Sequence, residues 1–232
     1  MDMTLKVTSV LSDPTRYSIY LYIREKRHEH SVQDIAEKFR IHPNVARLHL
    51  SKLEEIRVLQ SEYVKTGKGG RPGKRYIPSE EVVQLSFPPR DFRLLSDLTL
   101  TSLAKLGEEG FRVLVETGYE YGKSLVDHYL ESRNLSLVGV TRAQKLHVLS
   151  QIAKSIGFTL NESISDGDQI KFHYDHCPFN ENAKLEPVFI CGLHNALLKG
   201  MFETLYSVEE FNQEENMIND CSTCRYHVIV TN

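Results

Sequence analysis

The sequence predicts an α+β fold in which a helix-rich, basic N-terminal domain precedes an acidic domain of mixed helices and strands. Two observations indicate this division. Apolar residues recur at helical spacing early in the chain, and a hairpin of short alternating strands is expected later, at 157–163 and 169–175. Residues 1–78 hold 15 Lys and Arg against 9 Asp and Glu, which leaves 13 against 22 for the rest. We expect domains at 1–86 and 136–232, with a helical linker or dimerisation region at 87–135.

The stretch from residue 31 to residue 59 predicts two short helices joined by a tight turn. Ser31 is a candidate N-cap for a helix over 31–39, and Pro43 suits the first turn of the next helix. The expected buried stripe of the second helix is Val45, Leu48, Leu50, Leu53, Ile56 and Leu59. A supporting helix should start near Pro14. This arrangement is a helix-turn-helix, although two ordinary core helices would give the same pattern.

A basic, glycine-rich segment follows directly and decides between these alternatives. Two strands are expected at 59–65 and 75–78, and the loop between them is rich in glycine. From Lys65 to Arg75 the chain has five basic residues and no acidic one, which suits contact with a phosphate backbone. The stretch therefore predicts a winged helix-turn-helix that binds a double-stranded DNA operator. The expected DNA-binding residues are His42, Asn44, Arg47, His49, Lys52, Lys65, Lys68, Arg71 and Lys74.

The region after the two prolines at 88 and 89 is expected to be helical from Phe92 to about Leu130. Its leucines cover more than one face, so the helix is either a dimer interface or a buried core helix. We expect a homodimer, because one recognition helix reads too few base pairs for useful specificity. A helix over 141–156 capped by Thr141, a helix over 188–205 and a closing strand over 225–230 complete the predicted elements.

All four cysteines lie in the last part of the chain, at Cys177, Cys191, Cys221 and Cys224. Such clustering favours a metal or redox site over structural disulfides in a cytosolic protein. Nearby histidines, His173, His176 and His194, could replace a cysteine as ligand. A buried inert role for Cys191 is the plain alternative. We expect no enzyme, because a thiol oxidoreductase would need companion motifs that the sequence lacks.

Two sets of motifs resemble known regulators. LSDPTR, the helix-turn-helix and the basic wing resemble the DNA-binding domain of ArsR-like bacterial transcription regulators, without the helix cysteines of the metal-sensing members. HCPF, ICGLHNALLKG and CRYHVIV resemble the SufR-type repressors, which bind an iron-sulfur cluster. This resemblance implies a repressor with a cluster held by Cys177, Cys191 and Cys224, and Cys221 as an extra thiol nearby. A structural zinc, a thiol-disulfide switch or a small-molecule pocket remains an alternative.

The sequence has no secretory leader and no apolar run near 18 residues, so we expect a cytoplasmic protein without a membrane partner.

Overall fold

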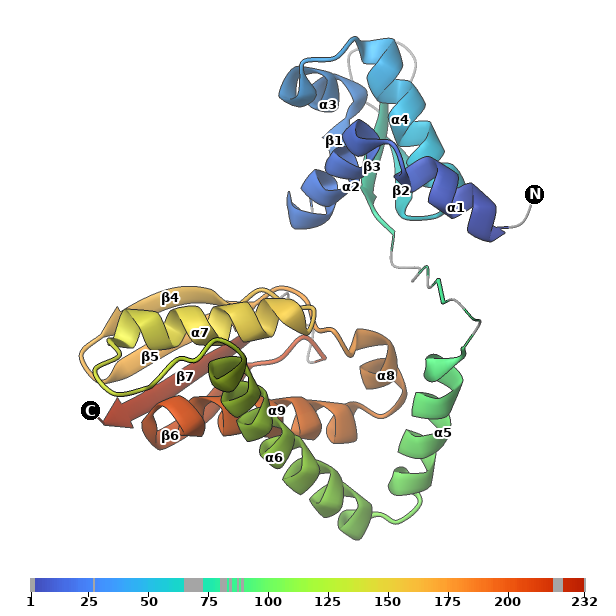
Figure 1. Cartoon of the computed structure of the whole chain (residues 1–232). Helices are drawn as coiled ribbons and strands as arrows, with labels where there is room; N and C mark the ends of the chain where they lie inside the picture. The colour runs from blue at the N-terminus through green and yellow to red at the C-terminus, as the bar shows by residue number, and fades with distance from the viewer. Residues whose placement is uncertain are drawn as a thin grey trace. The chain divides into compact units, whose positions relative to one another are not determined.

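The structure is a computed structural model that describes residues 3–26, 28–64, 73–79, 83, 85–86, 88, 90–218 and 223–231. The chain divides into two compact units, Met1–Arg90 and Asp91–Asn232. The first unit is helical with a small sheet, and the second combines helices with a four-stranded sheet (Figure 1). The predicted α+β fold is confirmed. In the described part of the chain, no helix is long and apolar enough to cross a membrane.

In its described part, the first unit consists of four helices and a three-stranded sheet. Its helices are α1 (Met3–Leu11), α2 (Pro14–Lys26), α3 (Val32–Phe39) and α4 (Pro43–Glu55), and its strands are β1 (His30–Ser31), β2 (Leu59–Val64) and β3 (Gly73–Pro78). Ser31 caps α3 in a capping box, because its hydroxyl accepts from the Asp34 amide while the Asp34 carboxylate accepts from the Ser31 amide. Strands β1 and β2 both pair with β3 in antiparallel register.

The helical segment predicted from Phe92 to Leu130 is two helices, α5 (Phe92–Ala104) and α6 (Glu108–Ser132). The break falls at Gly107, whose φ of 61° lies in the left-handed region that glycine tolerates best. Both helices belong to the second unit. The predicted region 87–135 is therefore divided by the unit boundary at residue 90, and most of it packs with the C-terminal elements.

The sheet of the second unit is antiparallel with strand order β4, β5, β7, β6. The strands are β4 (Asn161–Asp166), β5 (Gln169–Tyr174), β6 (Ser207–Glu215) and β7 (Cys224–Thr231), and the remaining helices are α7 (Arg142–Ser155), α8 (Asn180–Leu185) and α9 (Pro187–Leu205). Thr141 caps α7 as predicted, with Gln144 completing a capping box. Buried residues alternate along β5 and β7, so one face of the sheet is covered.

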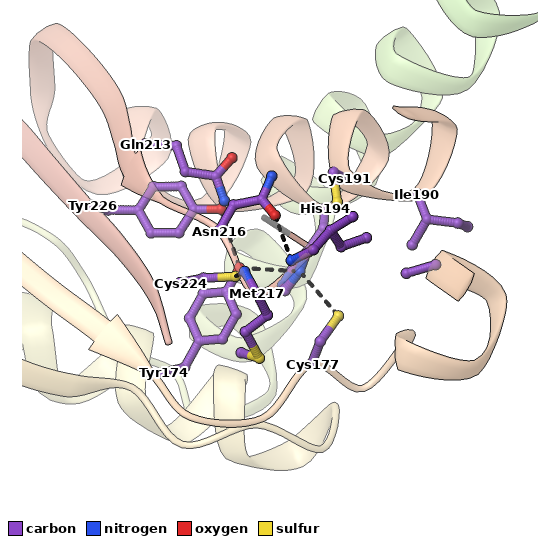
Figure 2. A pocket seen from close by; sticks show the side chains of 12 residues that line it. Tyr174, Cys177, Ile190, Cys191, His194, Gln213, Asn216, Met217, Cys224 and Tyr226 are labelled. Carbon is purple, nitrogen blue, oxygen red and sulfur yellow. Dashed lines mark hydrogen bonds between the residues drawn. The ribbon is translucent and has the colours of Figure 1, made fainter. Parts of the chain in front are cut away.

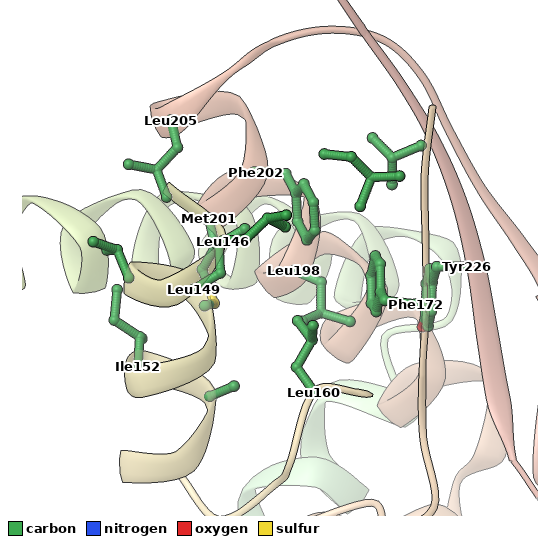
Figure 3. Close-up of a cluster of buried hydrophobic side chains, with 14 of the residues drawn as sticks. Leu146, Leu149, Ile152, Leu160, Phe172, Leu198, Met201, Phe202, Leu205 and Tyr226 are labelled. Carbon is green, nitrogen blue, oxygen red and sulfur yellow. The ribbon is translucent and has the colours of Figure 1, made fainter. Parts of the chain in front are cut away.

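The main core of this unit lies between the sheet and α7 and α9 (Figure 3). Leu149 and Ile152 from α7 meet Leu198 and Phe202 from α9, and all four are at most 2% exposed. Phe172 on β5 stacks on Phe202 and on Tyr226 of β7, with ring centroids 5.0 Å apart in both pairs. These contacts fix α9 against β5 and β7, the three elements beside the cysteines.

Glycines allow α6 to approach α9 closely. A Cβ at Gly122 would lie 2.1 Å from the Leu197 carbonyl oxygen, and one at Gly200 would lie 2.2 Å from the Tyr119 carbonyl oxygen. Such contacts require the absence of a side chain at these two positions. Tyr119 also donates a hydrogen bond to the Glu203 carboxylate at 2.5 Å. The two helices are therefore held backbone to backbone.

Candidate functional site

Helix α4 is the second helix of the helix-turn-helix, and its burial pattern defines which face can meet DNA. Ala46, His49, Leu50 and Leu53 are buried, whereas Asn44 and Arg47 are exposed. The Arg47 guanidinium donates to the Asn44 side-chain oxygen at 2.9 Å. Both side chains lie in the first turns of the helix, where base-reading residues of this motif are found.

The predicted buried stripe of α4 is wrong at two positions. Val45 is 41% exposed and Leu48 is 55% exposed, whereas Leu50, Leu53, Ile56 and Leu59 are buried as expected. Ala46 and His49 are buried instead. The buried positions 46, 49, 50 and 53 are mostly three or four residues apart, so they form one face of the helix. The helix is thus rotated relative to the expectation, and two apolar side chains face outward.

Three of the predicted DNA-binding residues of this motif form hydrogen bonds or ion pairs with other residues of the first unit. The His42 ring accepts a hydrogen bond from the Asn44 amide at 3.2 Å and so caps α4. His49 is buried, and its Nδ1 accepts a hydrogen bond from Nε of Arg16 on α2 at 3.3 Å. Lys52 pairs with Glu55 at 3.1 Å on the exposed side of the same helix. Of these three, His49 cannot reach a base edge without leaving the core.

The loop of the wing, residues 65–72 between β2 and β3, lies outside the described residues, and Lys65, Lys68 and Arg71 belong to it. Lys74 forms an ion pair with Glu54 of α4 at 2.6 Å, and its ammonium group lies 5.1 Å from the centre of the Tyr76 ring. Arg75 pairs with Asp34 at 3.2 Å. These two pairs join the wing strand β3 to α4 and α3, and a phosphate would have to compete with a carboxylate for either cation.

The second unit brings together three cysteines that are far apart in the sequence (Figure 2). Cys177 follows the end of β5, Cys191 lies in the second turn of α9, and Cys224 begins β7. All three are free thiols that line one pocket. Cys221 lies outside the described residues. Convergence of Cys177, Cys191 and Cys224 is the arrangement that the sequence pattern suggested.

His194 is the fourth chemically active side chain of this pocket, which we call the thiol pocket. It lies on α9, three residues after Cys191 and therefore on the same helix face. Its Nδ1 is 3.7 Å from the Cys177 sulfur and 3.2 Å from the Tyr174 hydroxyl. Its Nε2 is buried without a hydrogen-bond partner among the described atoms. Its Nδ1 is therefore the ring nitrogen that faces the Cys177 thiol.

Burial favours the neutral forms of two thiols, of the imidazole and of the two tyrosines in this pocket. Burial raises the pKa of the Cys177 thiol to about 11, and it raises the pKa of Cys191 as well. Burial also lowers the pKa of His194 to about 4, which keeps the imidazole neutral. The hydroxyls of Tyr174 and Tyr226 share a hydrogen bond at 3.1 Å on the pocket wall, and burial raises the pKa of both. Protonated thiols of this kind are poor nucleophiles and gain reactivity only when they lose the proton.

The space between these groups is about 20 Å³, which is room for about one water-sized body. In the described part of the chain, no three Cys, His, Asp or Glu side chains lie close enough together to hold one metal ion. The side chains of the thiol pocket would have to turn inward to ligate a metal. The donor types, three thiols and an imidazole, suit zinc or an iron-sulfur centre.

The sequence pattern found the three thiols and named His194 among three candidate histidines. His173 and His176 do not line the pocket, and His173 lies 3.7 Å from the Asp175 carboxylate instead. The tyrosines Tyr174 and Tyr226 were missed. Their only sequence signal is an inward position on an alternating strand, which they share with ordinary core residues.

Comparison with known proteins supports the division into two functional parts. Residues 11–61 match a family described as "Helix-turn-helix domain", and residues 133–229 match a family described as "Methanogen output domain 1". The second match contains Cys177, Cys191 and Cys224. A comparison with curated proteins gave no match.

Solved structures show only remote likeness. A trafficking protein particle complex subunit 3 from Naegleria fowleri, covalently bound to palmitic acid, is 15% identical with a TM-score of 0.43, over 60% of this chain and 97% of that one. An H-NOX protein from S. oneidensis in the Fe(II)NO ligation state is 14% identical with a TM-score of 0.39, over 67% of this chain and 84% of that one. The N-terminal match remains the informative one: the chain carries an N-terminal helix-turn-helix domain, the type of domain found in DNA-binding transcription regulators.

Proposed function

We propose that the protein is a transcriptional repressor that binds operator DNA as a homodimer and whose thiol pocket controls its affinity for DNA. One observation carries this proposal. A chain with an N-terminal helix-turn-helix brings three distant cysteines and a neutral histidine to one buried pocket of its other unit. Regulators commonly join a DNA-binding module to a module whose chemistry changes with the signal.

We assign the DNA contacts to those predicted residues whose side chains are exposed or at the surface. Asn44 and Arg47 project from the first turns of α4 and would reach base edges in the major groove. Lys52, Lys74 and the basic residues of the wing loop would contact phosphates, with Lys74 and Lys52 first releasing the carboxylates that they bind. His49 is left out of this interface, because it is buried against α2.

An iron-sulfur cluster is the first candidate for the thiol pocket. Thiolates are the preferred ligands of such clusters, and the resemblance to SufR-type repressors assigns Cys177, Cys191 and Cys224 to this role. Either His194 or Cys221 would supply the remaining ligand. A cluster is larger than the present space of about 20 Å³, so the pocket would have to widen around it.

A single zinc ion is the second candidate, and the size of the pocket favours it. Three thiolates and one imidazole form an ordinary tetrahedral zinc set, and a single ion needs only an atom-sized space. The same argument disfavours a small-molecule ligand, which requires a pocket of several hundred Å³. A thiol-disulfide switch would use the same cysteines without any metal.

We propose that a change in the thiol pocket is transmitted to the unit boundary through α8 and α5. Helix α8 begins three residues after Cys177, and Asn182 on α8 donates hydrogen bonds to Ser96 and Asp97 of α5 at 3.2 and 3.0 Å. Ala183 of α8 also packs in one buried cluster with Leu100 of α5. Because α5 starts directly after the boundary at residue 90, a change at Cys177 can reach the chain that leads to the helix-turn-helix.

The test is to measure metal content and operator affinity together. The protein is purified without oxygen, and visible absorbance, iron, sulfide and zinc are determined for the parent and for Cys177→Ser, Cys191→Ser, Cys224→Ser and Cys221→Ser. We expect the first three substitutions to abolish the metal centre and to change operator affinity about tenfold or more, since a coupling of 1.4 kcal/mol is sufficient. Cys221→Ser serves as the internal control and should have a smaller effect.

The outcomes separate the candidates. Visible absorbance with iron and sulfide supports the cluster, whereas zinc alone in the oxygen-free preparation rejects it in favour of zinc. Variants that lose the metal yet bind DNA like the parent would show that the centre is structural and does not control DNA binding.

A further inference from the structure

The outward face of the recognition helix α4 carries two apolar side chains that the core does not use. Val45 is 41% exposed and Leu48 is 55% exposed. They lie three residues apart, hence next to each other on one side of the helix. Ala46, His49, Leu50 and Leu53 supply the packing of α4 against its own unit. The exposure of Val45 and Leu48 therefore needs a reason other than core packing.

The surroundings of this pair are polar and basic in the first half of the helix. Asn44 and Arg47 are its exposed neighbours, and Arg40 is exposed at the end of α3. The acidic residues of α4, Glu54 and Glu55, lie in its last turn, where they pair with Lys74 and Lys52. An apolar pair with arginines beside it fits a partner surface on which apolar groups lie next to anionic groups.

We propose that Val45 and Leu48 determine operator specificity by contacting the methyl groups of thymines in the major groove. This proposal rests on the proposed function, namely that α4 enters that groove. The C5 methyl of thymine is the apolar group that base edges present in the major groove, and aliphatic side chains contact it directly. The two side chains are separated by about 4.5 Å along the helix axis, a distance between one and two base-pair steps of ~3.4 Å.

Val45 and Leu48 therefore recognise bases by apolar contact, in addition to the hydrogen bonds that Arg47 and Asn44 make. Arg47 can recognise guanine by its two hydrogen-bond acceptors, and Asn44 can recognise adenine. Val45 and Leu48 have no hydrogen-bonding groups on their side chains, so they can distinguish thymine only by its methyl group. The expected operator has thymines within or directly beside the base pairs that Arg47 and Asn44 contact.

The experiment removes the methyl group without changing the base pair. A preferred operator is selected from random duplexes with the full-length protein, and each thymine under the recognition helix is replaced by deoxyuridine. Burial of one methyl group corresponds to roughly fourfold in affinity, so we expect a loss of about fourfold for each contacted thymine. In Leu48→Ala or Val45→Ala, the difference between thymine and deoxyuridine should disappear at the corresponding position.

Leu5→Ala provides the matched control. Leu5 is 58% exposed on α1, so the same substitution is made at a similarly exposed leucine outside the recognition helix. It should keep the full difference between thymine and deoxyuridine. All these side chains are at the surface, and thermal unfolding of each variant shows whether the fold is intact.

Three results would overturn the inference: a selected operator without thymine under the helix, equal affinity for the thymine and deoxyuridine duplexes, or a full difference that persists in both alanine variants. A change of oligomeric state in Leu48→Ala would also overturn it, because the pair would then cover a protein surface. Failure of the parent to bind any duplex at low salt rejects the proposed function itself, and is thereby distinct from failure of methyl reading.

Discussion

His49 illustrates how a single residue can belong to the fold although its place in the sequence suggested DNA binding. Its Nδ1 accepts the hydrogen bond from Nε of Arg16, and the same guanidinium donates to the Val10 carbonyl oxygen at 2.8 Å. Arg16 therefore joins α1, α2 and α4. A proton on Nδ1 would abolish the acceptor and place a second positive charge beside Arg16.

We expect the first unit to lose stability as the pH falls below about 6.5. Burial and the charge of Arg16 lower the pKa of His49, against the opposing effect of Asp13. The unfolded chain therefore takes up a proton at a pH at which the folded state still excludes it, and the free energy of unfolding declines in that range. Urea unfolding between pH 7.5 and 5 measures this slope. His49→Gln keeps an acceptor for Arg16 and should reduce the slope, with the rest coming from His30, whose pKa burial also lowers. An unchanged slope would mean that His49 does not contribute.

Residue-level signals were reliable where local hydrogen bonding decides the structure. Ser31 and Thr141 were predicted as N-caps and both are capping-box residues. The stripe of α4 was less accurate, because a recognition helix must bury one face and expose another, and both faces contain apolar residues. Helical spacing alone could not show that Val45 and Leu48 lie on the outer one.

At the level of elements, the close crossing of α6 and α9 connects the thiol pocket to the rest of the second unit. Cys191 and His194 lie on α9. Backbone contacts at Gly122 and Gly200 hold this helix against α6. Since the backbones of the two helices meet directly at these glycines, α9 cannot shift without moving α6.

Gly122→Ala should destabilise the second unit, although alanine normally favours a helix over glycine by about 1 kcal/mol. The new Cβ would lie 2.1 Å from the Leu197 carbonyl oxygen, and this backbone atom cannot move aside cheaply. We expect a loss of about 1–3 kcal/mol in the free energy of unfolding. Ser124→Ala, at an exposed position of the same helix, is the control and should be neutral or slightly stabilising. A Gly122→Ala variant as stable as the parent would show that the crossing is looser than this.

The contact between α5 and α8 predicts a second effect at this level. Asn182→Ala removes the hydrogen bonds to Ser96 and Asp97, each contributing about 1 kcal/mol. Faster hydrogen exchange is expected in α5, and the response of operator affinity to Cys177→Ser should become smaller. Asn212→Ala, which removes only a bond to Glu210 on β6, should change neither. If α5 exchanges at the parental rate in Asn182→Ala, this contact does not hold it.

Helices and strands were predictable where their patterns are long, and short elements were missed. Helix α8 has only six residues and strand β6 is largely polar on its exposed face, so neither offers a clear period. Helix α1 lies before the supporting helix and was not anticipated. Gly107 was visible in the sequence, but only the structure shows that its positive φ separates α5 from α6.

At the scale of the whole molecule, the charge balance of the chain and the prolines at 88 and 89 indicated a division close to the observed boundary at residue 90. The clustering of all four cysteines late in the chain predicted a metal or redox site, and the resemblance to SufR-type repressors implied that Cys177, Cys191 and Cys224 would form it. The neutral forms of Cys177 and His194 could not be predicted from the sequence, because they depend on burial. Around His194 this burial includes the rings of Phe158, Tyr174 and Phe179, which only tertiary packing brings together.

The exposed side of α5 is the surface on which we expect the homodimer to form. Leu100 turns inward to a buried cluster, while Leu94, Leu95 and Leu98 are more than half exposed. A contiguous group of exposed leucines on one helix is typical of an association surface. Of the two alternatives that the sequence left open, this placement favours an interface over a fully buried core helix.

Replacing Leu95 and Leu98 together by glutamate should convert the dimer into a monomer, because four like charges would meet across a two-fold axis in place of apolar contacts. The monomer has one recognition helix and should bind an inverted-repeat operator at least tenfold more weakly. Analytical ultracentrifugation and operator titration measure the two effects. Leu135→Glu is the control, since Leu135 is 48% exposed beyond the end of α6, and it should leave both unchanged. A parent protein that sediments as a monomer at micromolar concentration, with and without its metal, would refute the dimer.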